Sequence, residues 1–240
     1  MGDLDRYAAA VRPAIDRIYV GLRAASRDRC HQVVTDHGVR PGFIDSFYFG
    51  LLARPMPADG FAGATAYHDA DMTEELDGGV LVVDDRGAWH LTPSGRALAL
   101  ALQVAIAHGS EESWGRRPIA TMPGLAVLPR LSDLLGTLLD AGLITGGPTF
   151  AAVVPVYEPP GASAALRVST RLGALRHHRS DAHQAAWKGA GLTLAELLAL
   201  ADGPQRLAIE DETNRRDAPI YGALTEPERQ EFLATLAALP

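Results

Sequence analysis

The chain has 240 residues, of which 47% are hydrophobic and 21% are charged, and its formal net charge is −7 at pH 7. This balance excludes a disordered tail and predicts a folded protein, built as one large domain or as two small ones that share an interface. The acidic total argues mildly against nucleic acid as a partner, since Lys and Arg supply most of the non-specific affinity for phosphates. The abundance of Ala and Leu favours helices.

The cysteine content and the start of the chain bear on the cellular compartment. The single cysteine, Cys30, can form neither an intramolecular disulfide nor a thiolate metal site, which is typical of a reducing compartment. The chain begins with Asp3, Asp5 and Arg6 where a signal peptide would have a basic start and an apolar run. The longest apolar stretches, such as 97–107, are shorter than a membrane span. We therefore expect a cytoplasmic protein that makes no membrane contact.

Helical spacing of apolar residues dominates the first 80 positions. It predicts an amphipathic helix over 3–26 and a second helix over 28–36. An apolar stripe rich in aromatic residues follows over 43–51, and it is more typical of a core than of a site. Two short helices are predicted over 60–67 and 69–77.

The middle and the end of the chain predict one hairpin among further helices. The segment 80–91 has the pattern of a strand, a Gly-containing turn and a strand. A Thr-Pro pair then begins a helix over 92–108, and the loop-like segment 109–124 is the expected domain boundary. Beyond it we predict a helix over 125–143, a strand over 150–157, a turn over 158–163, a long helix that ends at 189–191, and two helices that begin at capping boxes, Thr193 with Glu196 and Thr225 with Glu228.

The hairpin runs into its helix through Leu91, Thr92, Pro93, Gly95, Arg96 and Leu98, which match the pattern L-T-P-x-G-R-x-L. This arrangement resembles the winged helix-turn-helix of MarR-like bacterial regulators, over about residues 43–105. The resemblance implies a mainly α fold with a small β-wing. We expect a helical and winged-helix N-terminal domain over 1–110 and a helical C-terminal domain over 123–240.

In such a fold the helix at 68–79 occupies the position that reads DNA. This segment is acidic, and no Lys or Arg lies between Arg54 and Arg86. Base reading relies chiefly on Arg, Lys, Asn and Gln, and carboxylates are repelled by the phosphates on both sides of a groove. We therefore expect that DNA binding has been lost. The alternative is a ligand-responsive transcriptional regulator that contacts DNA through other basic residues, namely Arg86, Arg116, Arg117 and Arg171.

The segment 175–189 is dense in histidines and charges, and on a helix of 100° per residue it divides into three faces. Leu175, His178, Ala182, Ala186 and Gly189 form a packing face, His177, Asp181, Gln184 and Lys188 a solvent face, and Arg176, Arg179, His183 and Trp187 a flank between them. Because the polar groups do not converge on one point, we expect neither a metal site nor a cofactor. His177 and Asp181 are predicted to be an exposed helix pair.

The flank is the candidate site. Two guanidiniums and an imidazole beside an indole can hold an anion or a planar carboxylate against an aromatic face. His183 is also a candidate acid or base, because its ordinary pKa lies near neutrality. The alternative is structural, with Arg179 and His183 bonded to carbonyls or carboxylates of a neighbouring element. The polar segment 209–224 supplies second-tier ligand-binding candidates, which are Asn214, Arg215 and Tyr221.

Two polar segments match a second pattern. Leu175, Arg176, His178, Arg179, Asp181, His183 and Ala185 fit L-R-x-H-R-x-D-x-H-x-A, and Glu210, Thr213 and Asn214 fit E-x-x-T-[ND]. These segments are similar to an uncharacterised actinobacterial family of helix-turn-helix proteins. That resemblance carries no activity with it. Hydrolase, metalloprotease, nucleotide-binding and dinucleotide-binding patterns are absent from the sequence.

The sequence thus favours a winged-helix-derived cytoplasmic protein that binds a small anionic or polar-aromatic ligand between its two halves. The first alternative is the MarR-like regulator, acting as a homodimer. The second is a metal-free isomerase, cyclase or lyase that uses His183 as its acid or base. Whether the protein is an enzyme is left open by the sequence.

Overall fold

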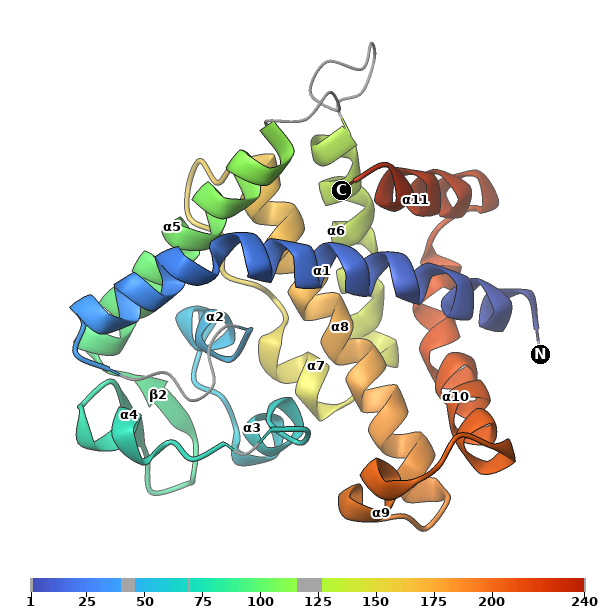
Figure 1. Ribbon diagram of the computed structural model, residues 1–240, viewed down its shortest axis with the longest axis horizontal. Coiled ribbons are helices and arrows are strands. Elements are labelled where there is room, and N and C mark those ends of the chain that lie inside the picture. Colours follow the sequence, from blue (N-terminus) through green and yellow to red (C-terminus); the bar gives the residue numbers. More distant parts are fainter. Residues whose placement is uncertain (1, 40–45, 69, 116–126, 240) are drawn as a thin grey trace.

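The computed structural model describes residues 2–39, 46–68, 70–115 and 127–239 (Figure 1). Within these residues the chain is mainly helical, with one small antiparallel sheet, as the sequence predicts. The elements in chain order are α1 (Asp3–Asp36), α2 (Ser46–Ala53), α3 (Ala58–Ala64), α4 (Thr73–Asp77), β1 (Leu81–Val83), β2 (Trp89–Leu91), α5 (Pro93–Gly115), α6 (Val127–Thr145), α7 (Pro148–Val153), α8 (Ala164–Gly189), α9 (Leu194–Ala199), α10 (Pro204–Asp217), the 3₁₀ helix η2 (Ala218–Ala223) and α11 (Glu226–Ala238).

Helix α1 is one unbroken helix of 34 residues, so the prediction of two helices separated near residue 27 was wrong. At the expected break, the Ser26 hydroxyl donates to the Leu22 carbonyl at 2.9 Å instead of capping a new helix. The buried face of α1 includes Val11, Ile15 and Ile18. The helix crosses α5 and then α8, and its N-terminal part lies beside α10 and α11 (Figure 1).

The predicted hairpin is confirmed, because β1 pairs antiparallel with β2 and Leu81 lies opposite Leu91. Its turn is closed by the Asp84 carboxylate, which accepts the backbone N–H groups of Arg86 at 2.9 Å and Ala88 at 2.8 Å. Gly87 takes φ +78°, the left-handed conformation that this turn requires. Thr92 then begins α5, and its hydroxyl accepts the Gly95 N–H at 3.0 Å.

Two predicted segments have a different structure. The strand predicted over 150–157 was wrong, since its first residues belong to helix α7. Pro148 in the first turn favours this helix. Asp181 of α8 also accepts the N–H groups at its start, and this long-range contact cannot be predicted from the local β propensity of the segment. The loop predicted from 109 was also wrong as far as residue 115, because α5 continues to Gly115. The rest of that loop lies outside the described residues.

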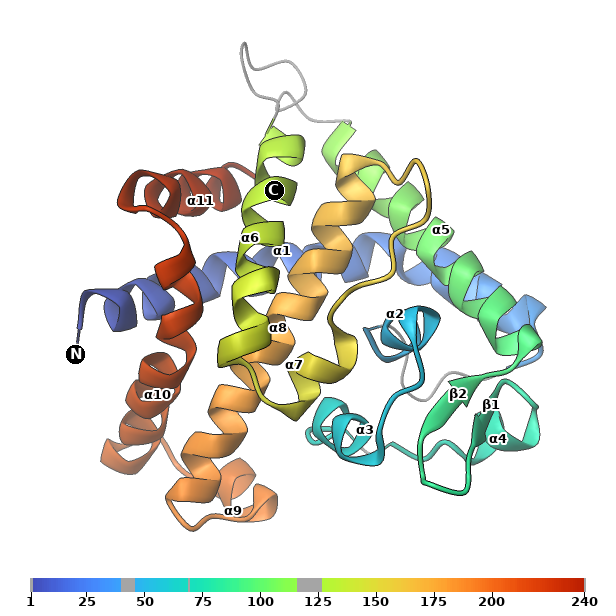
Figure 2. The same cartoon turned by 180° about the vertical axis from the view of Figure 1, so that it is seen from behind.

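Helix α8 is the centre of the fold, and its predicted end at Gly189 is confirmed. It packs against α5, α6, α7 and α10, and Figure 2 shows α6 and α8 side by side with α5 beyond them. The larger of two buried apolar clusters among the described residues runs from Ala8 of α1 to Leu239 after α11 and takes in α2, α5, α6 and α8. The two predicted halves therefore share one core, and the boundary between them at 110–123 stays a prediction.

The Asp181 cap yields a test of the fold. Its carboxylate accepts the N–H groups of Gly147 at 3.1 Å, Thr149 at 3.2 Å and Phe150 at 2.8 Å. Loss of such a cap costs about 1–2 kcal/mol, so we expect Asp181→Ala to lower the free energy of unfolding by that amount in urea denaturation. Asp211→Ala removes an exposed carboxylate from α10 and should change it by less than about 0.5 kcal/mol. Equal effects of the two substitutions would contradict the capping role.

Candidate functional site

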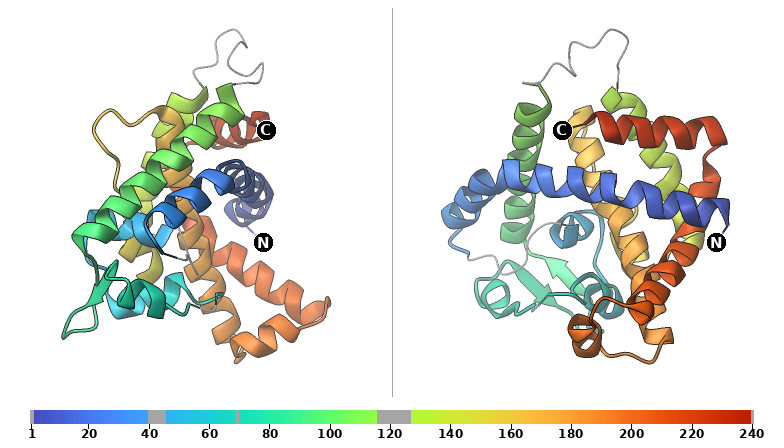
Figure 3. Two further views of the ribbon diagram at one scale, coloured as in Figure 1. Left: turned by 60° about the vertical axis from the view of Figure 1, so that its left-hand side comes forward. Right: turned by 45° about the vertical axis from the view of Figure 1, so that its right-hand side comes forward.

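A cleft of about 540 Å³ lies between α1, α8 and α10, closed at its edges by the end of α3 and by η2. Figure 3 shows α1 crossing in front of α8 with α10 beside it. Most polar side chains of the lining come from α1 and α8. The charged and titratable lining residues are Arg12, Asp16, Tyr19 and Arg23 of α1, Tyr67 and His68 after α3, Arg176, His177, Arg179 and His183 of α8, Glu210 of α10 and Tyr221 of η2.

Ion pairs across the cleft fix the position of α1. Arg176 Nε donates to Asp16 Oδ1 at 3.0 Å, and Arg12 donates to Asp16 Oδ2 at 3.3 Å. Arg12 also reaches α10, where its Nη1 lies 2.7 Å from Glu210 Oε2. A guanidinium from each side thus meets a carboxylate from the other, and the three helices are joined through charge-assisted hydrogen bonds.

The same network continues into the interior through Arg179. Its guanidinium donates to Glu210 at 3.2 Å and to Asp217 at 3.3 Å. Asp217 in turn lies 2.8 Å from Nδ1 of His178, whose Nε2 lies 2.9 Å from the Thr145 hydroxyl of α6. The side chains of His178 and Asp217 are each only 1% exposed. The prediction that His178 is a packing histidine is confirmed, and its packing includes this buried polar pair.

A second polar chain places His183 in the cleft. Trp187 Nε1 donates to the Tyr67 hydroxyl at 3.1 Å, and that hydroxyl lies 2.7 Å from His183 Nδ1. The Tyr67 and His183 rings are also stacked, with centroids 5.7 Å apart. The other imidazole nitrogen, Nε2, lies 3.9 Å from Glu210 Oε1. Tyr67 therefore orients the imidazole and leaves Nε2 on the side of Glu210.

Aromatic rings form the other half of the cleft surface. The Arg176 guanidinium lies 4.2 Å from the centroid of the Tyr19 ring, and that of Arg23 lies 5.2 Å from the same centroid. Tyr221 packs edge to face against Tyr7, with centroids 5.3 Å apart. The phenol rings of Tyr19, Tyr67 and Tyr221 thus line the cleft together with the guanidiniums.

The pKa values of the three histidines in the cleft are all lowered. Burial, helped by the positive charge of Arg176, lowers the pKa of His177 to about 4. Burial also lowers the pKa of His183, although the nearby Glu210 carboxylate opposes the shift. The pKa of His68 is lowered by burial and by Arg176. At neutral pH these three imidazoles are uncharged, so the positive charge of the cleft comes from arginines.

The predicted ligand-binding residues divide into two groups. Arg176, Arg179, His183 and Tyr221 lie together in the cleft lining, and the structural alternative for Arg179 and His183 also applies, because both face Glu210. The other three are corrected by the structure. Trp187 is buried in a small cluster beyond Tyr67, Asn214 is buried outside the cleft lining, and Arg215 is exposed and paired with Glu212 on its own helix.

The predicted solvent face of α8 was largely wrong, because α3 and α7 pack against part of it and the cleft takes another part. His177 lines the cleft, Asp181 caps α7, and Gln184 is buried with its amide donating to the Gly63 carbonyl at 3.1 Å. Lys188 is exposed as predicted. Sequence reasoning missed four polar residues of α1, although their i, i+3 and i, i+4 spacings place them on one face: Arg12, Asp16, Tyr19 and Arg23.

Two of the four alternative DNA-binding residues, Arg86 and Arg171, lie among the described residues and on different elements. Arg86 is exposed at the hairpin turn. Arg171 is half-buried and donates to Glu158 at 2.6 Å and 2.9 Å and to the Ser132 carbonyl at 2.7 Å, and these bonds disfavour its assignment to DNA contact. Arg116 and Arg117 lie outside the described residues.

Comparisons with known proteins give no relative from which a role for the cleft could be inferred. No protein-family model, no curated protein and no solved structure matches the chain. Across the described segments, no three His, Cys, Asp or Glu side chains gather in an arrangement that suits a metal ion. None of the described helices combines the length and the apolar character required to cross a bilayer.

The lowered pKa of His177 predicts a pH dependence of stability. Because the folded state disfavours the imidazolium, the unfolded chain takes up a proton that the folded protein does not bind between pH 6.5 and about 4. The stabilisation is complete above pH 6.5 and is lost as the pH falls toward 4, by at most about 1.4 kcal/mol per pH unit. We expect His177→Gln to show a shallower loss in urea denaturation over pH 7 to 4.5. His31→Gln, which removes an exposed imidazole from α1, is the control, and identical slopes for wild type and His177→Gln would contradict the assignment.

Proposed function

We propose that the protein binds a small, planar, monoanionic organic molecule in the cleft between α1 and α8. The observation that carries this proposal is the cleft itself. Its volume of about 540 Å³ is that of a small-molecule site, and guanidiniums, imidazoles and phenols converge on it from four elements. A polar surface of this density inside a helical protein is more than packing requires.

Charge pairing in the lining limits the negative charge that the ligand carries. The lining contains four guanidiniums and the two carboxylates of Asp16 and Glu210. Arg12, Arg176 and Arg179 already pair with these carboxylates or with Asp217 behind them. Since the imidazoles are neutral at pH 7, a carboxylate or a similar monoanion suits the guanidinium-rich lining, whereas a polyanion meets carboxylates that repel it.

We further propose that the scaffold is derived from a winged helix and has lost its DNA-binding face. The order of elements supports this origin. After α2, Met56 pairs with Trp89 of β2 in an isolated antiparallel bridge, and α3, α4 and the hairpin follow. Around α4, which precedes the hairpin, the exposed charged residues are Asp71, Glu74 and Asp77. Carboxylates in this position repel phosphates.

The ligand-binding proposal predicts a difference between matched arginines. Arg12 and Arg29 both lie on α1, both pair with a glutamate, and are 43% and 41% exposed, but only Arg12 lines the cleft. We expect 1-naphthoate and benzoate to bind more tightly than 1-naphthamide and benzamide in isothermal titration calorimetry. Arg12→Gln should weaken carboxylate binding about tenfold, and Arg29→Gln should leave it unchanged.

The same comparison is available on α8, where Arg176 lines the cleft and Arg167 lies outside it beside Glu158. Arg176→Gln should weaken naphthoate binding, and Arg167→Gln should not. Equal affinity for the carboxylates and their amides, or equal effects of the matched arginine substitutions, would contradict an anion site in this cleft.

Loss of the DNA face predicts the outcome of a binding assay with duplex DNA. In fluorescence anisotropy at 50 mM salt, we expect no salt-sensitive binding of the wild-type chain to a labelled 30-base-pair duplex, whether random or taken from its own upstream region. A triple variant with Asp71→Asn, Glu74→Gln and Asp77→Asn should gain weak, salt-sensitive binding because the repulsion is removed. Sequence-selective binding by the wild type would favour the regulator.

A further inference from the structure

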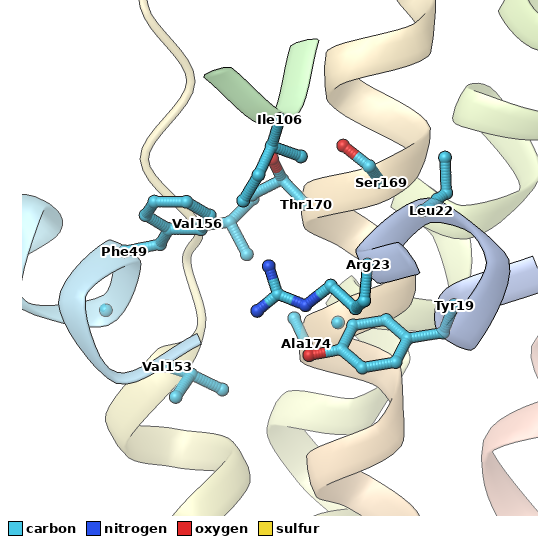
Figure 4. A pocket seen from close by; sticks show the side chains of 12 residues that line it. Tyr19, Leu22, Arg23, Phe49, Ile106, Val153, Val156, Ser169, Thr170 and Ala174 are labelled. Carbon is cyan, nitrogen blue, oxygen red and sulfur yellow. The ribbon is translucent and has the colours of Figure 1, made fainter. Parts of the chain in front are cut away.

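A second, inner cavity of about 30 Å³ lies behind the cleft, and Figure 4 shows its side chains. Its walls come from α1, α2, α5, α7, α8 and the segment after α7. Most of them are apolar, including Phe49, Ile106, Val153, Val156 and Ala174. By the measure in which one water needs about 10–15 Å³, this inner chamber accommodates a group of two or three heavy atoms.

The inner chamber and the cleft meet at a wall of side chains. Tyr19, Arg23 and Gly173 belong to the linings of both cavities. Tyr19 and Arg23 extend from adjacent turns of α1, with the Arg23 guanidinium directed toward Phe49 and Val156 (Figure 4). On the opposite side, Gly173 presents no side chain. Tyr19 and Arg23 therefore separate the chamber from the cleft, and a branch of a bound ligand enters the chamber when these two side chains change rotamer.

The hydroxyl group of Thr170 indicates which kind of ligand atom the chamber binds. Thr170 lines the chamber, is 6% exposed, and its Oγ1 has no hydrogen-bond partner among the described residues. The neighbouring Ser169 hydroxyl, by contrast, donates to the Leu166 carbonyl at 2.9 Å. A buried hydroxyl without a partner is unfavourable, and one acceptor atom inside this mostly apolar chamber satisfies it.

We propose that the inner chamber is a subsite for a short acyl branch of the bound anion, such as an acetyl group. The carbonyl oxygen of the branch accepts a hydrogen bond from Thr170, and its methyl group packs against Ile106, Val153 and Val156. This inference rests on the proposed function, because the branch enters from the cleft. It narrows the ligand class to a planar monoanion that carries a small ketone or ester group.

The experiment compares branches of the same shape with and without an oxygen acceptor. The probes are benzoate, 3- and 4-acetylbenzoate, and 3- and 4-isopropenylbenzoate, titrated by calorimetry into the full chain. We expect at least one acetylbenzoate to bind more tightly than benzoate and about 3- to 10-fold more tightly than its isopropenyl counterpart. In Thr170→Val, the acetyl and isopropenyl probes should bind equally.

A second variant tests the space itself. Val156→Leu adds one methylene to the chamber wall and should bring the affinity for both branched probes down to that for benzoate, with benzoate binding unchanged. Thr170→Val should unfold at a urea concentration close to that of the wild type, because the lost hydroxyl has no protein partner among the described residues. This variant keeps the proposal testable if Val156→Leu fails to fold.

The outcomes separate the subsite from the cleft. If benzoate binds but the branched probes bind no more tightly, or if their advantage survives both substitutions, the acyl subsite is overturned and the anion site in the cleft stands. If none of the carboxylates binds and Arg12→Gln behaves like Arg29→Gln, the proposed function is overturned and the subsite with it.

Discussion

The buried contact between His178 and Asp217 determines where the parts of the cleft lie. A carboxylate that is 1% exposed is costly unless it is paired, and Asp217 is paired with both His178 and Arg179 of α8. Because Asp217 ends α10, these bonds fix α10 against α8 and place Glu210 over the cleft. Without this contact, Arg12 and Arg179 would have no common partner.

The ion pairs above this contact prepare the cleft for a ligand. Arg12, Arg176 and Arg179 are each held by carboxylates, so their guanidiniums are oriented without an anion present. Preorganisation of this kind reduces the entropy lost on binding. The carboxylates also reduce the attraction for anions, which is the reason we propose a ligand with one negative charge and not several. Tyr67 has the equivalent role for His183. Its hydroxyl is hydrogen-bonded to Nδ1, which holds the imidazole ring with Nε2 facing Glu210.

Local patterns in the sequence were enough for much of the fold and for part of the site. The hairpin, the capping boxes at Thr193 and Thr225 and the packing of His178 follow from nearest neighbours along the chain or around one helix. A helical wheel shows which residues share a face of a helix, but it does not show which other elements pack against that face. It therefore misassigned Asp181 and Gln184, whose partners are more than 30 residues away. The polar side of α1 was missed for the same reason, because Arg12 acquires its role only when α10 is beside it.

The end of α3 and the residues after it contact α8. Tyr67 contacts His183 in the cleft, and the Gly63 carbonyl of α3 accepts a hydrogen bond from Gln184, the residue that follows His183. These contacts join the ligand side of α8 to the chain that leads into α4. In a regulator, such a connection would carry ligand occupancy to a DNA-reading helix. Here it leads to Asp71, Glu74 and Asp77, whose exposed carboxylates disfavour phosphates. The cleft has a dense polar lining whereas the exposed charged residues around α4 are acidic, and this contrast is the reason we propose ligand binding as the primary role.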